Sequence, residues 1–279
     1  MAVSSPQFRS NPLTLRILVI GLCCSALALA SGSILAQTLK AGAKTTASAG
    51  IDIESFNNAS DSPLLRVGNK GAAVARAQIL LDRAWFSCGE IDGRYAANMQ
   101  RMVKAFQSAR DLKVTGTVTA ETWKALREDT APLLTRYTVT EKDMVGPFEK
   151  TPADMNERAK LKALVYESVE EALSEKFHTS IAYLKQLNRG RKVEAGNEIA
   201  VPNTSGTSTP VKAASIQIDK SERVLYVLDA AKRPVAGFPI SIGNEKNDPL
   251  PVGMMAVKNE VKNPSFTYDP KLLKSAPKD

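Results

Sequence analysis

The spacing of apolar residues changes along this 279-residue chain from a helical period to the two-residue period of a strand. Between residues 63 and 130, apolar side chains recur every three or four positions, as they do on one face of an amphipathic helix. After residue 212 they alternate or form short continuous runs, which is typical of strands. A uniform helical or β fold is therefore excluded, and the sequence predicts a modular α+β chain.

The first 36 residues have the three-part pattern of a secretory signal peptide. Arg9 and Arg16 precede an apolar run over residues 17–30, and small residues follow up to Ala36. Cleavage is expected after Ala36 or, alternatively, after Ala30. The apolar run has about 14 residues, fewer than the roughly 20 that cross a bilayer as a helix, so an uncleaved anchor is the second interpretation. We expect an exported protein of the periplasm or cell wall.

Cysteine and histidine are scarce, which limits the chemistry available to the chain. It has three cysteines and one histidine, so a metal site built from several of these residues is excluded. Only Cys88 lies beyond the signal segment, and no internal disulfide is expected. Cys88 is interpreted as a small buried apolar residue and His178 as a helix-end residue, rather than as a nucleophile and its base. No metal and no cofactor are expected.

The charge balance favours an anionic partner only weakly. Lysine and arginine number 37 against 29 acidic residues, and removal of the signal segment lowers the formal charge from +8 to +6. Such a charge suits an anionic polymer such as the cell wall, or a lipid surface, or simply supports solubility. No nucleic acid is expected as a partner, and the membrane is expected to be contacted only through the signal segment.

Residues 37–62 are rich in Ala, Ser, Thr, Lys and Asn and are interpreted as a flexible tether.

Residues 63–130 predict three short helices around one apolar cluster, with Thr119 capping the third helix. The motif residues of this region are Leu65, Gly68, Gly71, Val74, Gln78, Leu81, Ile91, Asp92, Gly93, Val103, Phe106, Gln107, Leu112, Gly116, Thr122 and Leu126.

These motif residues resemble the helical peptidoglycan-binding domain found beside many cell-wall enzymes. The resemblance implies non-catalytic affinity for peptidoglycan, both glycan strands and stem peptides, through a shallow groove near the Asp-Gly turn. The binding residues expected from it are Asp92, Gly93, Arg94, Tyr95 and Gln107.

Residues 137–203 predict a strand, two helices and a closing strand. The strand covers residues 137–140, Ser168 opens the first helix, Thr179 caps the second, and residues 198–202 close the unit. The second helix is expected to turn Ile181, Leu184 and Leu187 inward. This order resembles a LysM carbohydrate-binding module, which implies contact with N-acetylglucosamine chains. The glycan-binding residues expected from it are Leu187, Asn188, Val201 and Pro202. A long insertion between residues 143 and 167 leaves a spacer domain without ligand as the alternative.

Residues 204–211 read as a linker, and residues 212–279 predict strands at 214–219, 222–229, 235–242 and 252–260. Ile216-Gln-Ile-Asp219, Leu225-Tyr-Val227, Phe238-Pro-Ile-Ser-Ile-Gly243, Leu250-Pro-Val-Gly253 and the stretch 263–268 resemble the opening of an L,D-transpeptidase catalytic domain. The resemblance implies cell-wall cross-linking by acyl transfer through a cysteine nucleophile that a histidine assists.

No cysteine follows Cys88 and no histidine follows His178 in this sequence. No catalytic residue is therefore assigned, and the chain as given is expected to be an inactive fragment of a longer protein. The first hypothesis is an exported, peptidoglycan-binding L,D-transpeptidase-like protein. The alternatives are a non-catalytic peptidoglycan-binding adaptor and a membrane-anchored periplasmic protein whose last strands pair with a partner's sheet. The oligomeric state stays open.

Overall fold

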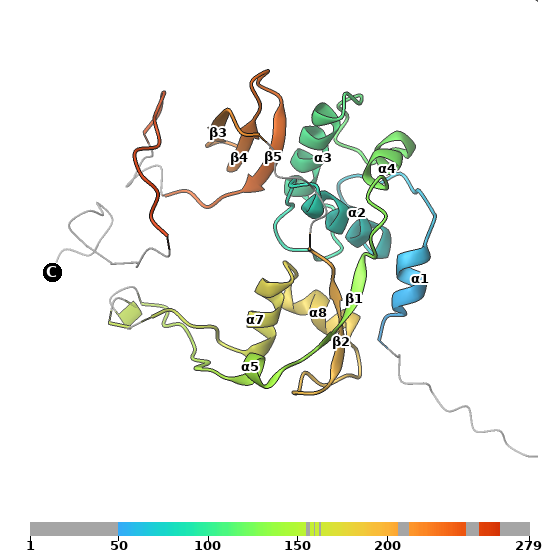
Figure 1. Ribbon diagram of the computed structural model, residues 1–279, viewed down its shortest axis with the longest axis vertical. Helices are drawn as coiled ribbons and strands as arrows, with labels where there is room; N and C mark the ends of the chain where they lie inside the picture. The colour runs from blue at the N-terminus through green and yellow to red at the C-terminus, as the bar shows by residue number, and fades with distance from the viewer. Residues whose placement is uncertain are drawn as a thin grey trace, which may run out of the picture. The chain divides into compact units, whose positions relative to one another are not determined.

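The computed structural model describes residues 50–154, 157–158, 160–161, 163–205, 212–243 and 251–262. Its elements, shown in Figure 1, are the helices α1 (Ile53–Asn58), α2 (Ala72–Arg83), α3 (Ala97–Ala109), α4 (Ala120–Leu126), α5 (Glu141–Met144), α7 (Val169–Lys176) and α8 (Ile181–Leu187) and the strands β1 (Leu134–Thr138), β2 (Glu198–Pro202), β3 (Ser215–Asp219), β4 (Val224–Leu228) and β5 (Pro234–Pro239). The predicted signal segment and most of the predicted linker lie outside the described residues. Within the described ranges, no helix is both long and apolar enough to cross a membrane.

Helix α1 corrects the prediction of a flexible tether for residues 50–62. Phe56 is buried in the main apolar core. The Asn57 side chain accepts hydrogen bonds from the backbone N–H groups of Leu133 and Leu134 and donates one to the Leu134 carbonyl. The small polar residues around Phe56 and Asn57 led to the prediction of a tether. One buried aromatic side chain and one hydrogen-bonded amide nevertheless hold this short helix against the rest of the chain.

The three predicted helices of residues 63–130 are present as α2, α3 and α4. Their inward positions form one core, whose largest buried side chains include Ile79, Leu81, Met99, Met102, Phe106 and Trp123. Thr119 caps α4 as predicted, because its side chain accepts a hydrogen bond from the Thr122 N–H. The Trp123 indole donates to the Pro63 carbonyl at 2.8 Å, which ties the segment before α2 to α4.

Strands β1 and β2 flank α5, α7 and α8 in sequence and pair with each other. The pairing is antiparallel, from Leu134 opposite Pro202 to Thr138 opposite Glu198. The strand therefore starts three residues before the predicted one, whereas the closing strand has the predicted bounds. A second, smaller core lies between this ribbon and helices α7 and α8, and it consists of Val139, Leu173, Leu184, Ile199 and Val201.

The start of α8 differs from the prediction by one residue. Ser180, rather than Thr179, accepts the capping hydrogen bond, which comes from the Tyr183 N–H. Thr179 instead donates its hydroxyl to the Ile91 carbonyl at 2.7 Å. This shift leaves Ile181 exposed and buries Tyr183. The Thr179 side chain lies against the Ile91 carbonyl rather than over the first turn of α8, and the local sequence does not reveal this long-range contact.

Strands β3, β4 and β5 form a three-stranded antiparallel sheet in chain order. Strand β5 packs on α3, where a Cβ atom added at Gly237 would lie only 2.9 Å from the Met102 sulfur. The predicted fourth strand at 252–260 is wrong, because residues 251–262 adopt no strand and side chains such as Val252 are exposed. An alternating pattern yields a strand only where a neighbouring strand pairs with it, and no described strand does so here.

Candidate functional site

The turn after Ile91 is held from inside the helical domain by one glutamine side chain. Gln78 on α2 accepts hydrogen bonds from the backbone N–H groups of Asp92 and Gly93, at 3.2 and 2.8 Å. Its amide nitrogen donates to the Asp92 carboxylate at 2.9 Å. The same carboxylate accepts from the Arg94 N–H, and Gly93 has a φ of 69°. The turn is thus a rigid part of the domain surface.

Gln107 on α3 holds the next turn in the same way. Its side-chain oxygen accepts from the N–H groups of Thr115 and Gly116, at 2.8 and 2.9 Å. Its amide nitrogen donates to the Thr117 carbonyl and to the Thr122 hydroxyl. Two successive helices therefore each use one buried glutamine to fix the turn that follows them.

Three of the five residues predicted to bind peptidoglycan from the helical domain lie inside it. Gln107 is buried with its amide fully engaged, and Tyr95 is buried with its hydroxyl donating to the Gly116 carbonyl at 2.8 Å. Gly93 is buried as well and Asp92 is half-buried, so these four residues support the two turns of the domain. Only Arg94 presents an exposed side chain. Sequence reasoning grouped them because residues that fix a motif turn and residues that bind a ligand look alike in a sequence.

Three cationic side chains are exposed near this turn. Lys70 lies opposite Arg94 in an isolated antiparallel bridge, and Arg66 lies in the adjoining turn that closes on Asn69. All three side chains are exposed. We call Arg66, Lys70 and Arg94 the basic rim. Sequence reasoning missed Arg66 and Lys70, although both stand within the motif stretch between Leu65 and Gly71.

The four residues predicted to bind glycan in the second unit are also structural. Leu187, Asn188, Val201 and Pro202 are all buried. Asn188 donates to the carbonyls of Leu184 and Ala200 and accepts from the Ala200 N–H at 2.6 Å. It thus fastens the end of α8 to β2, and none of the four is placed to contact a polymer.

Cys88 is buried and His178 is exposed, although both lie near Asp82. Burial, with Asp82 and Asp92 nearby, raises the pKa of the Cys88 thiol far above its ordinary value, so the thiol stays protonated. The His178 Nδ1 lies 2.8 Å from the Asp82 carboxylate, and this hydrogen bond raises the pKa of the imidazole. The prediction that Cys88 is a buried apolar residue is confirmed, and His178 lies just past the end of α7 as predicted.

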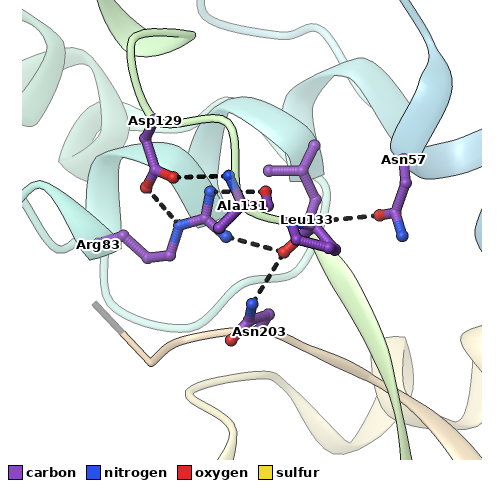
Figure 2. A network of polar contacts seen from close by, with 7 residues as sticks. Asn57, Arg83, Asp129, Ala131, Leu133 and Asn203 are labelled. Carbon is purple, nitrogen blue, oxygen red and sulfur yellow. Dashed lines mark hydrogen bonds and ion pairs between the residues drawn. The ribbon is translucent and has the colours of Figure 1, made fainter. Parts of the chain in front are cut away.

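A buried arginine connects parts of the chain that are far apart in sequence (Figure 2). Arg83, at the end of α2, forms an ion pair with Asp129 at 2.7 Å and donates to the carbonyls of Ala131 and Pro132. The Asn203 amide, just after β2, donates to the same Pro132 carbonyl at 2.9 Å. Sequence reasoning missed this network, whose one local signal is a cation on the apolar face of a helix.

The described residues hold no cluster of three or more His, Cys, Asp or Glu side chains arranged for a metal ion.

Residues 70–126 match the family described as a putative peptidoglycan binding domain. That range includes both glutamine-held turns and two members of the basic rim. No curated protein matches this chain. The chain therefore contains a peptidoglycan-binding domain at residues 70–126, which points to association with the cell wall.

Proposed function

We propose that the chain binds peptidoglycan through the exposed surface around the Asp92-Gly93 turn, with the basic rim as its main contact. The observation that carries this proposal is the contrast between a turn fixed by buried Gln78 and three cations exposed beside it. Peptidoglycan stem peptides carry carboxylates, which lysine and arginine side chains recognise. A fixed backbone adds to the affinity, because less conformational entropy is lost when the polymer binds.

Reversing two charges of the rim should weaken binding to purified sacculi. We expect the double variant Lys70→Glu with Arg94→Glu to need about tenfold more sacculi for half-maximal cosedimentation, which corresponds to about 1.4 kcal/mol. Both side chains are exposed, so the fold should be retained.

The control makes the same charge change in the other unit, at the exposed residues Lys142 and Lys150. Lys142→Glu with Lys150→Glu should cosediment like the unchanged chain. Equal losses in the two double variants would mean that net charge, rather than the rim, drives binding, and would contradict the proposal.

The finer proposal is that the chain belongs to an exported L,D-transpeptidase-like protein in which two wall-binding units raise the local concentration of substrate. The pairing of β1 with β2 around α7 and α8, with α5 as an additional helix, and the antiparallel β3–β4–β5 sheet are compatible with the LysM-like and transpeptidase-like resemblances. Cys88 is no candidate nucleophile, because its thiol is buried and protonated.

The buried, protonated thiol of Cys88 also fits the alternative function, which is a non-catalytic peptidoglycan-binding adaptor. Under both proposals, the described residues bind the cell wall without catalysing its cross-linking. The purified chain, incubated with a disaccharide tetrapeptide, should release no D-alanine. Release that Cys88→Ser abolishes would show that Cys88 acts as a nucleophile, and would contradict this part of the proposal.

A further inference from the structure

A cavity of about 590 Å³ is lined by none of the residues of the basic rim. It is bordered by the end of α2 and the turn that follows it, by α7 and the start of α8, and by the end of β5. Backbone hydrogen bonds join these segments around it: the Ile91 N–H donates to the His178 carbonyl, and the Ser87 N–H donates to the Gly237 carbonyl. The cavity is therefore built by contacts between segments distant in sequence.

Trp85 forms part of the wall of this cavity in a conformation that suits glycine better. Its φ is 70°, it follows the C-cap of α2, and 39 % of its surface is exposed. Bulky residues rarely adopt this backbone region, and glycine is the usual residue just past a helix end. The Trp85 N–H donates to the Asp82 carbonyl, and its own carbonyl accepts from the Gly237 N–H. Backbone contacts on both sides thus hold an exposed indole at the cavity.

Ser174 supplies an unused polar group in the same wall. The residue is only 5 % exposed, and its hydroxyl has no hydrogen-bond partner among the described residues. Buried hydroxyl groups in folded proteins nearly always have a partner. An unpaired hydroxyl group on a residue that lines a cavity indicates a ligand that supplies the missing hydrogen bond.

The charges around the cavity favour a cationic ligand. Two of the lining carboxylates, those of Glu90 and Glu175, belong to exposed residues and form no ion pair or hydrogen bond among the described residues. The two cationic side chains of the lining are already paired, Arg83 with Asp129 and His178 with Asp82, which also lines the cavity. The unpaired charge at the cavity is thus negative.

We propose that this cavity binds a primary ammonium group carried on a sugar or peptide unit. Glu90 and Glu175 pair with the ammonium group, the Trp85 indole covers the apolar part of the unit, and the Ser174 hydroxyl forms a hydrogen bond with it. This inference rests on the proposed function, because peptidoglycan offers such amines on stem peptides and on sugars that have lost their acetyl group. It adds a second contact site, separate from the basic rim, with the opposite charge preference.

Intrinsic fluorescence can follow the binding, because the chain has two tryptophans and Trp123 is buried. A change in emission therefore reports chiefly on Trp85. The probes are a glucosamine tetramer and the peptide Ala-Glu-Lys-Ala, each compared with a form in which every amino group is acetylated. At least one amine probe should give a saturable change, and its acetylated form should bind about tenfold more weakly. Which probe binds distinguishes the sugar source from the peptide source.

Substitutions can distinguish a loss of ligand binding from a loss of folding. Glu90→Gln with Glu175→Gln should weaken binding of the amine probe about tenfold, whereas Glu121→Gln with Glu128→Gln, exposed acids outside the cavity lining, should not. Trp85→Gly suits the backbone conformation and should keep the melting temperature unchanged or raise it. Calorimetry should nevertheless show loss of probe binding by this variant.

The inference and the proposed function can fail separately. A chain that sediments with sacculi but responds to none of the four probes overturns the inference and leaves the proposed function standing. Binding of an amine probe that survives both Trp85→Gly and the double glutamine variant also overturns the inference. A chain that binds an amine probe in this cavity but stays in solution with sacculi contradicts the proposed function instead.

Discussion

Replacing Arg83 with methionine is expected to lower the free energy of unfolding by about 3–5 kcal/mol, because it leaves a partly buried carboxylate without its partner. The Arg83 side chain is fully buried, and the Asp129 side chain is 18 % exposed. The substitution also removes the donors that reach the carbonyls of Ala131 and Pro132. Urea denaturation followed by circular dichroism measures the change.

An exposed ion pair of the same domain supplies the matched comparison. Arg110 and Glu128 lie 3.1 Å apart, with side chains 46 % and 65 % exposed. Glu128→Gln should change the free energy of unfolding by less than about 1 kcal/mol, since solvent screens exposed pairs. An effect of Arg83→Met no larger than that of Glu128→Gln would contradict the view that the Arg83 network holds these segments together.

Replacing Gln107 with leucine is expected to destabilise the domain by about 3 kcal/mol, because it leaves several buried polar groups without partners. The N–H groups of Thr115 and Gly116 lose their hydrogen bonds, and the Thr117 carbonyl keeps only the one from the Thr115 hydroxyl. Leucine has a similar volume, so the loss reflects hydrogen bonding rather than a cavity. Urea denaturation gives the free energy, and hydrogen exchange at Gly116 should show the local loss of protection.

Gln100→Leu makes the same chemical change on the same helix. Gln100 is only half-buried and its side chain has no hydrogen bond among the described contacts, so its effect should stay within about 0.5 kcal/mol. Comparable losses at Gln100 and Gln107 would indicate that leucine disturbs α3 in general, and would contradict a specific role for Gln107 in holding the turn.

The helices and most strands could be predicted because their signals are local. Apolar residues at helical spacing predicted α2 and α3, and a threonine in front of such a run predicted the cap of α4. The bounds of β2 followed from a short apolar run that ends in proline. The same reasoning failed at residues 252–260, where the pattern was present but no described strand pairs with it.

The candidate site was only partly predictable, because burial depends on contacts between segments distant in sequence. The Asp92-Gly93 turn was located correctly, yet Tyr95 and Gln107 are buried supports of the fold and not exposed ligand contacts. The same holds for Asn188, whose partners on α8 and β2 occupy its whole amide. Trp85 stands beside Cys88 in the sequence, but nothing nearby indicates that α7 and β5 complete a cavity around it.

The most direct test of the account is cosedimentation of the purified chain with peptidoglycan sacculi at physiological salt. The account predicts that the unchanged chain and the Lys142→Glu with Lys150→Glu variant enter the pellet, while the Lys70→Glu with Arg94→Glu variant stays largely in solution. An unchanged chain that remains in the supernatant would contradict peptidoglycan binding by this protein. Full retention of the Lys70→Glu with Arg94→Glu variant would contradict the basic rim as the contact surface.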